Sequence, residues 1–171
     1  MTSHAPGILA PVIKSVSVAC TPRDAFRYFT ADMAQWWPLH THSCIAGRSK
    51  GGESPVSCVF ERHTGGRIFE RGASGEEHEW GRVLVWDPPA KVSFTWHPGR
   101  PTDTAQHVEV TFAPEEGGTR VLLTHTGWEA LGDAASDTRS RYESGWELVL
   151  VERFVGYVAH EGRPAGKEKR T

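Results

Sequence analysis

Apolar and polar residues alternate along several short stretches of this chain, and a period of two is typical of half-buried β-strands. The alternation predicts strands at 12–18, 56–60, 67–71, 80–86, 92–96 and 108–112, and a last strand that begins near Val121. Gly, Pro and Asp residues between these stretches predict short turns. Successive strands joined by short turns indicate an antiparallel meander with one buried face and one solvated face.

Two short helices are predicted between the first strand and the second. Thr21 is a favourable N-cap and Pro22 suits the first helical position, so a helix is expected from Pro22 to Phe29. Asp32 can cap a second short helix, which Pro38 ends because proline cannot continue a helix.

The hydrophobic period changes from two to about 3.6 near residue 138. Five apolar or aromatic residues then recur at helical spacing: Tyr142, Trp146, Val149, Leu150 and Tyr157. This pattern predicts one continuous helix over 138–158, with Ser136 or Asp137 as its N-cap.

The order of these elements favours one packing, because only the last helix is long enough to cover the apolar face of the sheet. We therefore expect an α+β fold in which a curved antiparallel sheet of six to seven strands surrounds the C-terminal helix. Residues 11–160 are expected to form the domain, residues 1–10 a flexible leader and residues 161–171 a flexible tail.

Composition narrows the class of protein. A length of 171 residues fits one domain, and a formal net charge of −2 gives no electrostatic case for nucleic-acid binding. No apolar run approaches the ~18 residues of a membrane span, and the N-terminus lacks the features of a signal peptide. Three cysteines without CxxC spacing fit reduced thiols, so we expect a cytoplasmic protein.

Several short motifs occur in order along the chain: Thr21-Pro22, Trp36-Trp37-Pro38, Gly65-Gly66-Arg67, Gly81 with Val83, Asp87-Pro88-Pro89, Phe94-Thr95-Trp96, Gly118-Thr119, Thr124-His125, Gly127 and Gly145-Trp146. With these motifs the chain resembles the START/Bet v 1-like superfamily, in the branch named after the activator of Hsp90 ATPase C-terminal domain. The resemblance implies a helix-grip fold and an internal cavity for a small hydrophobic molecule. It implies little about which molecule, because one fold hosts many functions.

Ten residues are expected to face the space between the sheet and the last helix: Trp37, Phe94, Trp96, Val110, Phe112, Leu123, His125, Tyr142, Trp146 and Leu150. They are predicted to bind the ligand, although the same residue types also close ordinary dry cores. A buried neutral His125 could orient a ligand or relay a proton. The alternative is a structural histidine bonded to a backbone carbonyl.

No metal, cofactor or catalytic motif is predicted. The loop expected at 38–52 contains His40, His42 and Cys44, but nothing in the spacing completes a zinc site. No phosphate-binding or nucleophile motif occurs in the sequence. For acid–base chemistry, the inward-facing candidates are His125 and, less directly, Glu70 or Arg82.

Three functions remain open. The chain could hold a small hydrophobic or aromatic compound as a carrier or sensor. It could instead be a cyclase, lyase or hydrolase of the same fold, in which case two titratable groups should converge in the cavity. A third alternative is an activator of the Hsp90 ATPase, which would require a protein partner for which the residues give no support.

Overall fold

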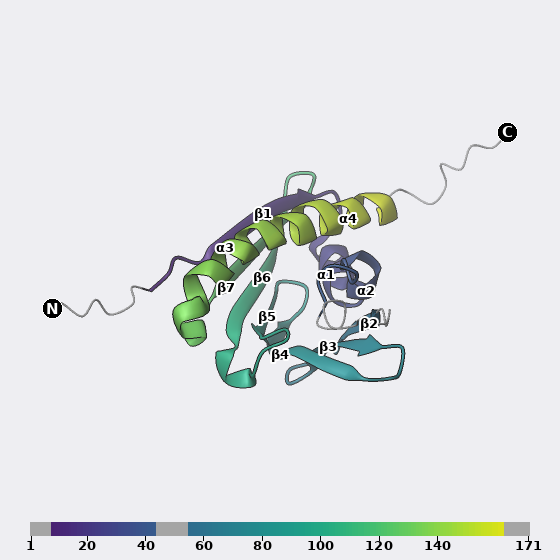
Figure 1. Cartoon of the computed structure of the whole chain (residues 1–171). Helices are drawn as coiled ribbons and strands as arrows, with labels where there is room; N and C mark the ends of the chain where they lie inside the picture. Colours follow the sequence, from purple (N-terminus) through teal and green to yellow (C-terminus); the bar gives the residue numbers. More distant parts are fainter. Residues whose placement is uncertain (1–7, 44–54, 163–171) are drawn as a thin grey trace.

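The computed structural model describes residues 8–43 and 55–162, which form a curled antiparallel sheet with a long helix across it (Figure 1). Seven strands pair in the order β1-β7-β6-β5-β4-β3-β2. Their bounds are β1 (Val12–Val18), β2 (Pro55–Phe60), β3 (Arg67–Gly72), β4 (Glu77–Asp87), β5 (Lys91–Trp96), β6 (Gln106–Glu115) and β7 (Gly118–Thr126). The predicted antiparallel sheet is therefore confirmed, with β1 joined to β7 rather than to its neighbour in sequence.

The alternation along each strand separates the two faces of the sheet. In β7, Val121, Leu123 and His125 are buried, whereas Leu122 and Thr124 between them are only partly covered. Pairing in register with both neighbouring strands places all three buried side chains on the face that the C-terminal helix covers.

The helix α1 (Pro22–Thr30) begins as expected. The side chain of Thr21 accepts a hydrogen bond from the backbone N–H of Asp24 at 3.2 Å, and Pro22 occupies the first turn. The short helix α2 (Met33–Trp36) follows, but Asp32 makes no capping hydrogen bond and instead accepts one from the Tyr157 hydroxyl at 2.9 Å. The predicted capping role of Asp32 was therefore wrong, because its carboxylate accepts a hydrogen bond from the distant Tyr157 instead.

The C-terminal helix runs without interruption through α3 (Ala135–Trp146), a π-helical segment η3 (Glu147–Phe154) and α4 (Val155–Glu161). The prediction of one continuous helix over 138–158 is confirmed. The capping prediction was wrong, because the preceding 3₁₀ segment η2 (Trp128–Ala134) feeds directly into α3. Ser136 and Asp137 therefore lie inside the first turn, where no side-chain cap forms.

The helix lies alongside β1 and across the sheet, and α1 and α2 close the other end of the same face (Figure 1). Aromatic residues fill much of the space between these layers, for example Phe29, Phe94, Phe154 and Trp36, all of which are buried. No helix among the described residues is long and apolar enough to span a membrane. Most of the leader and tail expected from the sequence lies outside the described ranges.

Candidate functional site

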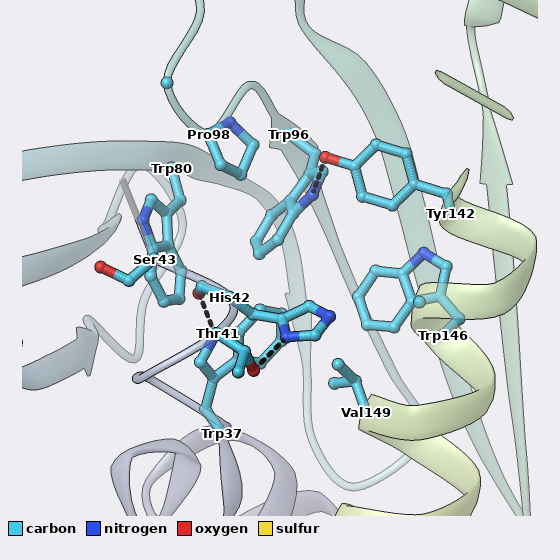
Figure 2. Close-up of a pocket in the computed structure, with 12 residues that line it drawn as sticks. Trp37, Thr41, His42, Ser43, Trp80, Trp96, Pro98, Tyr142, Trp146 and Val149 are labelled. Atoms are coloured by element: carbon cyan, nitrogen blue, oxygen red, sulfur yellow. Dashed lines mark hydrogen bonds between the residues drawn. The ribbon is translucent and has the colours of Figure 1, made fainter. Parts of the chain in front are cut away.

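A pocket of about 370 Å³ opens between α3, the chain that follows α2, and the adjoining ends of β4 and β5 (Figure 2). Four tryptophans from these elements form its walls: Trp37, Trp80, Trp96 and Trp146. Thr41 and Gly99 also line the pocket and are exposed, so it opens to solvent at that edge. Its volume lies within the range of small-molecule sites, about 300–1,000 Å³.

The four indoles pack against one another rather than lying separately. The ring centroid of Trp37 is 5.1 Å from that of Trp80, 5.7 Å from that of Trp96 and 6.0 Å from that of Trp146. Aromatic rings at such separations stabilise one another by edge-to-face and offset contacts. The walls of the pocket therefore form one connected cluster.

Every indole N–H in this cluster donates to an acceptor within the protein. The pairs are Trp37 Nε1 to the His42 carbonyl (2.8 Å), Trp80 Nε1 to Glu70 Oε1 (3.0 Å), Trp96 Nε1 to the Tyr142 hydroxyl (3.1 Å) and Trp146 Nε1 to His125 Nδ1 (3.0 Å). A donor that is already bonded has no proton to offer a ligand. The tryptophans consequently present aromatic surface and no hydrogen-bond donor to the pocket.

Glu70 anchors one wall from behind. It is fully buried on β3 and accepts hydrogen bonds from Trp80 Nε1 and from the Ser43 hydroxyl. One carboxylate therefore positions two residues that line the pocket. The sequence suggested an inward-facing Glu70 but did not reveal these partners. Arg82, the other charged candidate, is exposed and pairs with Glu79, so the expectation that it faces inward was wrong.

His125 supports the opposite wall. Its Nδ1 accepts the Trp146 N–H, and its Nε2 lies 3.3 Å from the side-chain oxygen of Gln106. These partners place the ring proton on Nε2. Burial, with a smaller contribution from His107, lowers the pKa of His125 to about 3, so the ring is neutral. The imidazole also stacks on Trp128, with 4.1 Å between the ring centroids. Its partners are therefore side chains, whereas the alternative prediction was a bond to a backbone carbonyl.

Four of the ten predicted ligand-binding residues line this pocket: Trp37, Trp96, Tyr142 and Trp146. The other six are buried and are not among the residues that line it: Phe94, Val110, Phe112, Leu123, His125 and Leu150. Sequence reasoning missed Trp80, His42 and Ser43. Trp80 and Val83 are three residues apart, so period two places them on opposite faces; both are buried because the pairing of β3 with β4 is irregular at Trp80.

His42 and Ser43 belong to the loop that was considered for metal binding. Cys44 of that loop lies outside the described residues. Within the described residues, no group of three potential metal ligands gathers. His42 instead bonds through Nδ1 to the Thr41 hydroxyl at 2.8 Å, and burial lowers its pKa.

Comparison with known proteins is consistent with this architecture. The family model described as Activator of Hsp90 ATPase homolog 1-like protein matches residues 19–159. A search of curated protein sequences finds no match.

Solved structures provide further similarity. An anthrahydroquino-gamma-pyrone synthase, Txn09, solved in complex with SUM, is 33% identical, with 89% of this chain and 99% of that chain covered and a TM-score of 0.57. An AHSA1-like protein from Aeromonas hydrophila is 17% identical, with coverages of 94% and 99% and a TM-score of 0.61. A protein from Rhodobacter sphaeroides is 21% identical, with coverages of 94% and 98% and a TM-score of 0.60. The last two similarities concern the fold alone.

Proposed function

Because this chain belongs to the Activator of Hsp90 ATPase homolog 1-like family, whose fold typically surrounds a ligand, we propose that it binds a planar aromatic small molecule in the tryptophan pocket. The observation that carries the proposal is the state of the four indoles. Each donates its N–H to an acceptor inside the protein, so the part of the indole that borders the pocket is ring and not donor. Such walls favour stacking and dispersion contacts over hydrogen bonding.

The charge distribution favours an uncharged ligand. No Lys, Arg, Asp or Glu is among the described residues that line the pocket. The nearest buried carboxylate, Glu70, contacts Trp80 and Ser43 from behind the wall. An anionic ligand would lose its hydration in the pocket without gaining a positive partner among the described lining residues.

Calorimetric titration with three related probes tests this proposal. We expect 2-methoxynaphthalene to bind, whereas 2-naphthoate should bind at least tenfold more weakly because its carboxylate meets no Lys or Arg among the described residues that line the pocket. A saturated analogue, 2-methoxydecalin, should also bind more weakly because it cannot stack. Equal binding of all three probes, or binding of none, would contradict the proposal.

A second candidate is a cyclase acting on an aromatic compound. The observation that favours it is the 33% identity to a pyrone synthase over nearly the whole of both chains. Two side chains in this pocket can handle protons, the His42 imidazole and the Tyr142 hydroxyl. Ring closure by addition of a ligand hydroxyl to an unsaturated ketone in the same molecule is an isomerisation and needs no oxidant or reductant.

The model compound 2′-hydroxychalcone separates the two candidates. Its phenol oxygen can add to the β-carbon of the enone. The proton lost from the phenol is matched by a proton gained at the α-carbon, where a new C–H bond forms. A cyclase should accelerate flavanone formation in proportion to protein concentration. Binding of the aromatic probes without any acceleration favours a binding protein.

A further inference from the structure

The imidazole of His42 is held in place at the edge of the tryptophan pocket. The main-chain carbonyl of His42 accepts the Trp37 indole N–H at 2.8 Å, and the main-chain N–H of His42 donates to the Pro38 carbonyl at 2.9 Å. Figure 2 shows the ring pointing across the pocket toward Trp146. With the backbone bonded in both directions and ring Nδ1 bonded to Thr41, the ring has a defined position relative to the walls.

The outer nitrogen of this ring, Nε2, lies next to Gly145 of helix α3. A Cβ atom added at Gly145 would lie 4.0 Å from His42 Nε2, so the nitrogen faces helix α3 at the point where that helix has no side chain. Both residues line the pocket. A ligand atom can therefore approach Nε2 from within the pocket.

The contacts of the neighbouring threonine favour one tautomer of the ring. Thr41 Oγ1 lies 2.8 Å from His42 Nδ1 and also donates to the Pro38 carbonyl at 3.4 Å. A hydroxyl has one proton, so both interactions form together only when Nδ1–H donates to Oγ1. The assignment that satisfies both bonds leaves Nε2 with a lone pair.

Nε2 of His42 makes no hydrogen bond to any described residue. Burial lowers the pKa of His42, so the imidazole is neutral near pH 7 and the lone pair is available. Other polar groups in the pocket are differently engaged: the four indole N–H groups are bonded, and the Ser43 hydroxyl donates to Glu70. Nε2 is thus an acceptor on a half-buried ring that borders the ligand space.

We propose that His42 Nε2 accepts a hydrogen bond from a hydroxyl group of the aromatic ligand, so that the pocket selects phenolic or enolic compounds. This inference rests on the proposed function and specifies the chemical class of its ligand. Stacking on the tryptophans supplies affinity for the ring system, and His42 distinguishes rings with a hydroxyl donor from rings without one. Thr41 is a positioning residue, because it acts by fixing the tautomer of His42.

Two probes with one ring system test the proposal. 2-Naphthol carries a hydroxyl proton and 2-methoxynaphthalene does not. We expect 2-naphthol to bind about 3- to 10-fold more tightly, the effect of one net hydrogen bond. The ratio should fall to about 1 in His42→Phe and persist in His40→Phe, a control at an exposed histidine of the same loop that does not line the pocket.

A measurement on the unaltered protein avoids any dependence on how a variant folds. In ¹⁵N-labelled protein, the Nε2 resonance of His42 should shift much further with 2-naphthol than with 2-methoxynaphthalene, which can affect it only through the nearby aromatic ring. Equal binding of both probes with no Nε2 shift would overturn the inference and leave the proposed function standing. A preference for 2-naphthol that survives His42→Phe would overturn it too. Failure of both probes to bind would overturn the proposed function itself.

Discussion

Trp146 of the C-terminal helix donates its indole N–H to Nδ1 of His125 on β7 across 3.0 Å. Both side chains are almost completely buried, at 2% and 0% exposed. The bond requires a neutral imidazole, because a protonated ring has no lone pair to accept it. Protonation of His125 therefore breaks the hydrogen bond that positions Trp146 in the wall of the pocket.

The first prediction concerns stability and pH. The pKa of His125 is about 3 in the folded protein and 6.5 for the ordinary side chain, so the unfolded chain binds more protons between these values. The contribution of His125 to the free energy of unfolding is fully present above pH 6.5 and is lost as the pH falls toward 3. Urea unfolding at pH 7 and pH 4.5 should show a loss of roughly 2 kcal/mol from this residue.

The control for this prediction is His125→Gln. A glutamine amide can accept from Trp146 and donate to Gln106, but it does not titrate. The variant should lose less stability between pH 7 and pH 4.5 than the parent protein does. Burial also lowers the pKa of His42, so part of the pH dependence should remain. Identical pH profiles for parent and variant would mean that His125 does not carry the effect.

The second prediction concerns the donor side of the same bond. Trp146→Phe keeps an aromatic ring but leaves His125 Nδ1 buried without its partner, which should destabilise the protein by about 1–3 kcal/mol. Trp86→Phe is the matched control, because Trp86 is half-buried and its indole makes no hydrogen bond to a described residue. Chemical denaturation measures both variants. A cost for Trp146→Phe no greater than that for Trp86→Phe would argue against an energetically important bond.

The third prediction concerns access to the pocket from the helix. Gly145→Leu should place a side chain beside His42 Nε2 and reduce the affinity for 2-methoxynaphthalene at least tenfold, because it occupies ligand space. Gly156→Leu is the control, since Gly156 is exposed, helical and outside this pocket. Both changes remove a helical glycine and should raise helix propensity by up to ~1 kcal/mol. Similar affinities for the two variants would place the ligand elsewhere.

The fourth prediction concerns the buried carboxylate. Glu70→Gln replaces one acceptor oxygen with an amide NH₂ group, so the Ser43 hydroxyl can no longer donate to this group and must turn to accept from it. The variant should lose about 1–3 kcal/mol of stability and bind the aromatic probes several-fold more weakly. Glu77→Gln, which removes only exposed ion pairs with Arg67 and Arg71, should change both quantities little. Unchanged probe affinity in Glu70→Gln would show that Glu70 does not organise the wall.

Much of the fold follows from local patterns. Period two identified the buried face of β7, and a helical period identified the helix that contains Trp146. The start of α3 was less predictable, because the preceding 3₁₀ segment leads directly into the helix without a side-chain cap. Capping preferences describe isolated helix ends and do not apply there.

The site was harder to predict than the fold. Period two places Phe94 and Trp96 on one face of β5, but it does not say how far along the strand the core ends and the pocket begins. His42 belongs to a loop, and its position depends on a hydrogen bond to Trp37 that no pattern encodes. The pairing of Glu70 with Trp80 likewise depends on the packing of β3 and β4.

The aromatic ligand is proposed to bind among Trp37, Trp80, Trp96 and Trp146. The protein has seven tryptophans, so a ¹H–¹⁵N spectrum contains seven indole N–H signals that can be assigned by single Trp→Phe substitutions. On titration with 2-naphthol, we expect the largest shifts at these four indoles, with Trp36, Trp86 and Trp128 nearly unchanged. No shift at saturating 2-naphthol, or shifts confined to the latter three, would contradict this proposal.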